Sequence, residues 1–71
     1  MNTIHSKEYR VMIKKLVEAR KTAGLLQSDV AKKLGVHQSF VSKIETCQRR
    51  VDVLELKKFA KLYGVSVGDL I

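Results

Sequence analysis

The chain has 71 residues, which is enough for one small domain and leaves no room for a second. It carries 14 Lys and Arg against 7 Asp and Glu, a formal net charge of +7, so its natural partner is a polyanion. The hydrophobic content of 45% excludes a disordered basic tail, because such a tail has little apolar material to bury. A core this small is marginally stable by itself, which favours a dimer.

The single cysteine, Cys47, excludes an intramolecular disulfide and a multi-cysteine zinc site. Neither histidine has acidic or thiol residues around it at ligand spacing, so we expect no metal and no cofactor. No uncharged stretch approaches the roughly 20 apolar residues that span a membrane, and the N-terminus lacks a signal-peptide run. These features predict a cytoplasmic protein without a membrane partner.

The first predicted helix begins near Ser6, a plausible N-cap, and continues as a stripe of apolar residues spaced three and four apart. Gly24 ends it, since glycine accepts the left-handed conformation of a helix cap. A second, short helix fits residues 27–34 and is closed by Gly35. The third, residues 38–45, follows after a link of only Gly35, Val36 and His37.

The fourth predicted helix begins at about Asp52, which forms a capping-box pattern with Glu55, and it ends at Tyr63 before Gly64. Ser66 can cap a last short helical turn at residues 67–71. No strand-like alternation is present. The sequence therefore predicts an all-α domain of five helices that covers residues 1–71.

Residues 27–45 have the features of a helix-turn-helix, in which two short helices flank a turn of three to four residues that contains glycine. In this motif the second helix enters the major groove of DNA. Val41 and Ile44 would pack inward from the third predicted helix. Its remaining side is polar and available for hydrogen bonds.

A set of spaced residues extends this pattern beyond the motif. With them the chain resembles the lambda-repressor-like, or XRE, family of bacterial and phage regulators over roughly Leu16 to Leu70. The residues that carry the resemblance are Arg20, Ala23, Gly24, Leu25, Gln27, Leu34, Gly35, Val36, Gln38, Val41, Ser42, Ile44, Glu45, Arg49, Leu56, Phe59, Ala60, Tyr63, Gly64, Val65, Ser66 and Leu70. The resemblance implies a compact domain that binds double-stranded DNA.

The resemblance also implies which residues face the bases. Gln38, Ser39 and Phe40 lie at the base-facing positions, and Lys43, one turn on, faces the groove or its wall. A glutamine amide can donate and accept together, which matches the N6 and N7 atoms of adenine. Phe40 can contact a thymine methyl group, or it can belong to the core beside Val41.

Phosphate contacts are implied for Gln27, Ser42, Arg49 and Arg50, because the family's second helix and the loop after the third lie along the DNA backbone. Arg20 and Glu45 resemble the family's partly buried ion pair between the first and third helices. We expect such a pair to serve orientation more than stability, because desolvation can offset the Coulomb attraction.

Two residues depart from the family pattern. Cys47 stands where the family usually has glycine, so the turn either differs locally or holds a strained residue. Leu26 stands where the family usually has Ser or Thr as the cap of the second helix.

We expect a homodimer that acts as a transcription regulator, specifically a repressor, on a pseudo-palindromic DNA site. The dimer surface, or in part the core, would take the surplus apolar residues Leu54, Leu62, Val67, Leu70 and Ile71. An enzyme is disfavoured because no nucleophile and base are suitably spaced. Two alternatives stay open: an antitoxin that binds a partner protein and regulates itself, and a controller of a restriction-modification system or mobile element.

Overall fold

The computed structural model describes residues 6–71, and this part of the chain forms four α-helices and one short 3-10 helix without a strand. The elements are α1 (Lys7–Thr22), α2 (Gln27–Leu34), α3 (Gln38–Glu45), α4 (Val53–Tyr63) and η2 (Val67–Asp69). The all-α prediction is therefore confirmed, and the bounds of α2 and α3 are those expected from the sequence.

The prediction of a fifth helix is wrong, because η2 is a single 3-10 turn of 3 residues. Ser66 caps it as expected: its Oγ accepts a hydrogen bond from the Asp69 backbone N–H at 3.2 Å. The Asp69 carboxylate accepts one in return from the Ser66 N–H at 3.0 Å, and hydrogen bonding from Ser66 to this carboxylate, first from its backbone N–H, lowers the pKa of Asp69. The turn stops there because Leu70 leaves it to enter the core, with only 1% of its surface exposed.

The other helix ends follow the sequence signals. Ser6 Oγ accepts from the Tyr9 N–H at 3.1 Å at the start of α1. At the start of α4, Asp52 accepts from the Glu55 N–H at 2.7 Å, and Glu55 accepts from the Asp52 N–H at 2.9 Å, so the predicted capping box is formed. Leu26 supplies no side-chain cap to α2, as its apolar side chain predicts.

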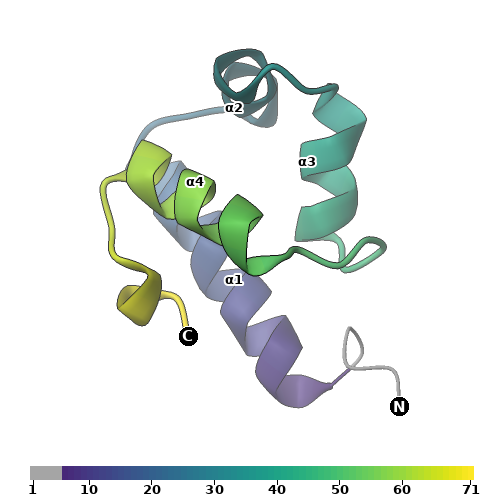
Figure 1. Ribbon diagram of the computed structural model, residues 1–71, viewed down its shortest axis with the longest axis vertical. Coiled ribbons are helices and arrows are strands. Elements are labelled where there is room, and N and C mark those ends of the chain that lie inside the picture. Colours follow the sequence, from purple (N-terminus) through teal and green to yellow (C-terminus); the bar gives the residue numbers. More distant parts are fainter. Residues whose placement is uncertain (1–5) are drawn as a thin grey trace.

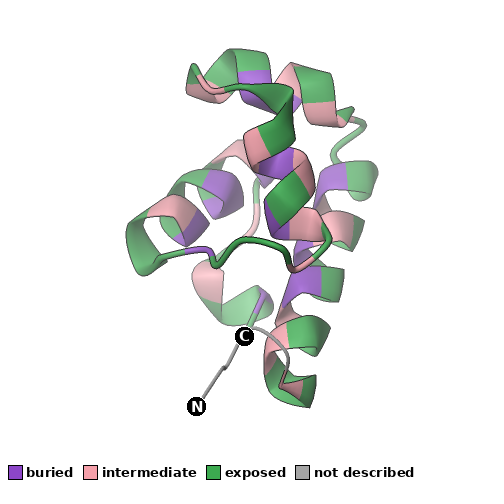
Figure 2. Ribbon diagram, turned by 90° about the vertical axis from the view of Figure 1, so that its right-hand side faces the viewer, coloured by how far each residue is buried: buried purple, intermediate pink, exposed green. Residues whose placement is uncertain are grey.

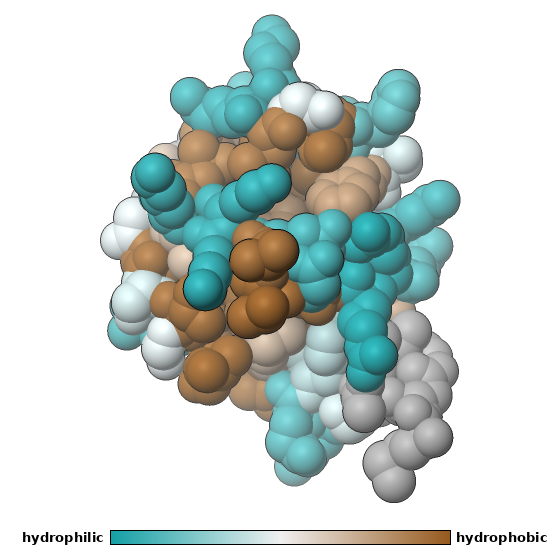
Figure 3. Space-filling view, in the orientation of Figure 1, coloured by the Kyte–Doolittle hydropathy of each residue, from teal (hydrophilic) through white to brown (hydrophobic). Residues whose placement is uncertain are grey.

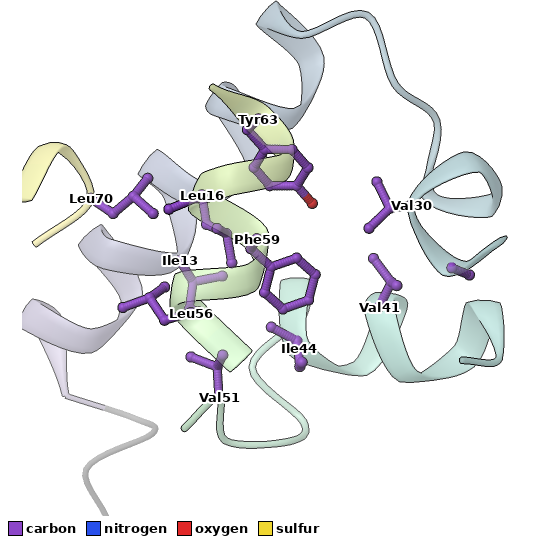
Figure 4. Close-up of a cluster of buried hydrophobic side chains, with 12 residues drawn as sticks. Ile13, Leu16, Val30, Val41, Ile44, Val51, Leu56, Phe59, Tyr63 and Leu70 are labelled. Carbon is purple, nitrogen blue, oxygen red and sulfur yellow. The ribbon is translucent and has the colours of Figure 1, made fainter. Parts of the chain in front are cut away.

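The core lies where α1, α3 and α4 meet beneath α2 (Figures 1 and 4). In Figure 1, α4 crosses in front of α1, with α2 above this pair and α3 to its right. The buried apolar side chains come from every element except η2, and they are Ile13, Leu16, Val30, Ala31, Val41, Ile44, Val51, Leu56, Phe59, Ala60, Tyr63 and Leu70. The sequence left Leu70 between a dimer surface and the core; its side chain lies in the core, with 1% of its surface exposed, so it is not available to a partner.

No helix in the described part of the chain is both long enough and apolar enough to cross a membrane.

Candidate nucleic-acid interface

Helix α3 presents a polar face to solvent because its opposite face is anchored in the core. Val41 and Ile44 are both 0% exposed and fix the rotation of the helix about its axis. Gln38, Ser39 and Lys43 are exposed, and Ser42 is partly buried beside them. Figure 2 looks onto this side, where α3 lies toward the viewer with the exposed loop of residues 46–50 below it. The structure thus brings the three predicted polar base-facing residues to one surface.

A buried hydrogen-bond cluster holds α3 against α1 and α2. Arg20 Nε donates to Glu45 Oε2 at 2.7 Å, and Arg20 Nη2 donates to Glu45 Oε1 at 3.2 Å. Arg20 Nη1 also donates to the Leu25 carbonyl oxygen at 2.7 Å. The two charged side chains are only 10% and 6% exposed. The ion pair that the resemblance implied is therefore present, and it ties α1 to the last residue of α3.

Gln27, the first residue of α2, is a further member of this cluster. Its Nε2 donates to Glu45 Oε1 at 2.8 Å, so the amide that was predicted to meet a phosphate is oriented by the carboxylate of α3. The same carboxylate thus receives hydrogen bonds from Arg20 and from Gln27. The Glu45 carboxylate therefore positions α1, α2 and α3 relative to one another.

Tyr63 borders this cluster, a placement that no pattern in the sequence predicts. Its hydroxyl is buried, makes no hydrogen bond with any described residue, and points toward Val30 in Figure 4. Burial raises the pKa of the Tyr63 phenol, the nearby Glu45 carboxylate raises it further, and Arg20 partly opposes the shift. The ring therefore stays neutral at physiological pH and leaves the charge of Glu45 matched to Arg20.

Arg49, in the loop after α3, contacts both α3 and α4. Its Cζ lies 4.5 Å from the centroid of the Phe40 ring, a cation-π distance. Its Nη1 and Nη2 donate to the two carboxylate oxygens of Glu55 at 3.1 and 3.3 Å, and Nη1 also donates to the Arg50 carbonyl oxygen at 2.9 Å. Phe40 is partly buried and packs against the core, which favours the packing alternative for this residue.

A second unforeseen contact fixes the far end of this loop. The Val51 backbone N–H donates to the hydroxyl oxygen of Tyr9 at 3.0 Å, across 42 positions of sequence. Since Tyr9 lies near the start of α1 and Val51 is buried, the loop is held between α3 and α1.

Cys47 has φ 60°, in the left-handed region that glycine adopts without strain. The strained alternative considered from the sequence is therefore confirmed. We expect Cys47→Gly to raise the free energy of unfolding by about 1 kcal/mol, because a residue with a Cβ pays roughly 1–2 kcal/mol in this conformation and glycine's greater freedom when unfolded offsets part of the gain. Urea denaturation measures the change. A lower midpoint for the glycine variant would mean that the thiol's packing outweighs the strain.

A helix-turn-helix whose second helix exposes a polar face belongs, as a class, to DNA-binding proteins. The family model described as helix-turn-helix matches residues 16–70. The chain belongs to the helix-turn-helix family, of the XRE type, whose members are DNA-binding transcription regulators.

One solved structure that resembles the chain is described as an XRE-family like protein from Pseudomonas syringae pv. tomato str. DC3000. The two have a TM-score of 0.86 and 43% sequence identity, and the match covers 96% of this chain and 83% of that chain. No curated protein gives a significant match.

Proposed function

We propose that this protein is a homodimeric transcription regulator that reads a pseudo-palindromic operator in double-stranded DNA, and that it acts as a repressor. The observation that carries the proposal is the exposed polar face of α3, held outward by the two buried residues Val41 and Ile44. Two copies of α3 would enter successive major grooves about 34 Å apart. A dimer bound over a promoter would then block the polymerase.

Base reading is assigned to Gln38, Ser39 and Lys43. Gln38 is the first residue of α3 and Ser39 the second, which is the end of a recognition helix that meets the base edges. Both side chains are exposed, so they are available to DNA without rearrangement. Phe40 contributes an apolar edge beside them, because most of its ring is committed to the core and to Arg49.

Phosphate contacts are assigned to Ser42 within α3, to Gln27 at the start of α2, and to Arg49 and Arg50 in the loop after α3. Gln27 starts α2, whose N-terminal amides have no side-chain cap and can donate to a phosphate. Arg49 and Arg50 are exposed in the loop that follows α3. The net charge of +7 supports binding to the backbone of either strand.

The dimer surface is assigned to the face that carries α4 and the C-terminal residues. Figure 3 shows apolar side chains in the middle of this face with hydrophilic ones around them. Leu54 and Ile71 are 65% and 70% exposed and would lose apolar surface to water-free contact in a dimer. Leu62 and Val67 are partly buried and would contribute their outer atoms.

The test is selection of bound sequences from randomised duplex DNA at near-physiological salt, with sedimentation analysis of the complex. Enrichment of an inverted repeat with half-sites about one helical turn apart, bound by two chains, is expected. If no motif is enriched, the basic surface serves a protein partner or non-specific binding, and the antitoxin function becomes the better hypothesis.

We also expect affinity for the selected site to fall steeply with salt, because each neutralised phosphate releases condensed counterions. For four phosphate contacts per chain the slope of log K against log salt would be about −3.6 per chain. The measurement is a titration by fluorescence anisotropy at several salt concentrations. An affinity that does not change with salt concentration would contradict the proposed phosphate contacts.

A further inference from the structure

The carboxylate of Glu55 holds Arg49 in the way that a DNA phosphate would. Two guanidinium nitrogens of Arg49 donate to the two oxygens of Glu55, at 3.1 and 3.3 Å. Arginine binds carboxylates and phosphates through the same paired geometry. The two ligands therefore compete for the same donors.

The position of this pair places the competition at the edge of the proposed DNA interface. Arg49 lines a shallow hollow together with Ser39 and Lys43 of α3, and its guanidinium lies over the Phe40 ring. The negatively charged Glu55 carboxylate therefore has two effects here: it accepts the hydrogen bonds of Arg49, and it repels DNA phosphates.

The ion pair is exchangeable because solvent reaches it. The side chains of Arg49 and Glu55 are 43% and 21% exposed, and pairs with this degree of exposure contribute little to folding. Glu55 has a separate structural role, since it accepts the hydrogen bond from the Asp52 N–H that caps α4. That role needs an acceptor oxygen and no charge, so a glutamine can take it over.

We propose that Glu55 is an affinity-setting residue: it is an internal competitor that a DNA phosphate displaces from Arg49 when the protein binds. In the exchange the guanidinium keeps its place over Phe40 and transfers its paired hydrogen bonds from the carboxylate to the phosphate. This inference rests on the proposed DNA-binding function and specifies how tightly the loop after α3 engages the backbone.

The test measures the DNA affinity of four proteins on the same DNA: the wild type, Glu55→Gln, Arg49→Ala and the variant that carries both substitutions. Glu55→Gln is expected to bind about three- to fivefold more tightly than the wild type, the range that an exposed ion pair supports. When Arg49 is already alanine, Glu55→Gln should raise the DNA affinity by a clearly smaller factor, since only the repulsion between Glu55 and DNA is then removed. An equal gain in both backgrounds, or weaker binding by Glu55→Gln, would overturn the proposal.

Glu18→Gln is the matched control, because Glu18 is exposed on α1 and lines a groove with Tyr63 and Val65, apart from the hollow beside α3. It changes the net charge by the same amount and is expected to raise affinity by less than Glu55→Gln. Thermal unfolding of Glu55→Gln within about 2 °C of the wild type shows that the α4 cap is kept; if Gln destabilises the fold, all affinities are compared at a temperature at which circular dichroism shows every variant to be folded.

The comparison is made on the selected operator and also on a duplex of random sequence at low salt. Phosphate exchange needs no particular base sequence, so the random duplex tests Glu55 even if selection yields no operator. A failure of the proposed function therefore appears as no enriched motif, whereas a failure of this inference appears as equal gains in the two Arg49 backgrounds.

Discussion

Replacement of Glu45 by alanine is expected to lower the free energy of unfolding by about 3–5 kcal/mol, the cost of leaving one charge of a buried pair without its partner. The Arg20 side chain is only 10% exposed, so water cannot take over the role of the carboxylate. The Gln27 amide loses its acceptor at the same time. For a domain of this size the loss is a large part of the total stability.

Two further variants show whether the unpaired charge is the cause. Glu18→Ala removes an exposed acid from α1 and should change stability by no more than about 0.5 kcal/mol. Replacing Arg20 by Met together with Glu45 by Leu removes both charges and should recover much of the loss, because no buried ion remains unpaired. Urea denaturation followed by circular dichroism gives all three values, and a loss below about 1 kcal/mol for Glu45→Ala would mean that water enters the cluster.

The Gln38→Ala, Ser39→Ala double variant is expected to bind the selected operator at least about 30-fold more weakly, since each lost base contact costs about 1–3 kcal/mol. Both side chains are exposed, so the fold should not change. Affinity for random-sequence DNA should stay within about twofold, because the phosphate contacts are untouched. Fluorescence anisotropy with the two duplexes measures both quantities.

Thr22→Ala serves as the control for this experiment, because Thr22 is an exposed polar residue at the end of α1, in the groove beside Val65 and Asp69. It should leave both affinities unchanged. Equal losses on operator and random DNA for the double variant would show that Gln38 and Ser39 support general binding and do not read bases.

Local signals in the sequence were sufficient for α2 and α3. Gly35 closes α2 with φ 69°, and the spacing of Val41 and Ile44 defines the buried side of α3. For Cys47 the sequence offered two alternatives, a locally different turn or a strained residue, and only its φ of 60° decides for the strained one.

Contacts between distant residues were not predictable in this way. The Val51–Tyr9 hydrogen bond and the Arg49–Glu55 pair depend on how the loop after α3 crosses the other helices, and periodicity contains no information about that path. The C-terminal turn is too short to show a period, so Leu70 could equally have faced the core or a partner. Tyr63 was recognisable as a core residue, but its place beside Glu45 was not.

The hydrogen bond between Val51 and Tyr9 has a consequence for how this domain can evolve. Residues 46–50 lie between two points fixed by other parts of the fold, Glu45 at one end and Val51 at the other. Thr46, Gln48, Arg49 and Arg50 are exposed, so substitutions at these four positions leave the helix core unchanged, whereas Cys47 packs against that core at a positive φ. The exposed positions of the segment can therefore vary in charge and hydrogen-bonding groups from one descendant to the next, which would alter how tightly the DNA backbone is held without a new fold having to be stabilised.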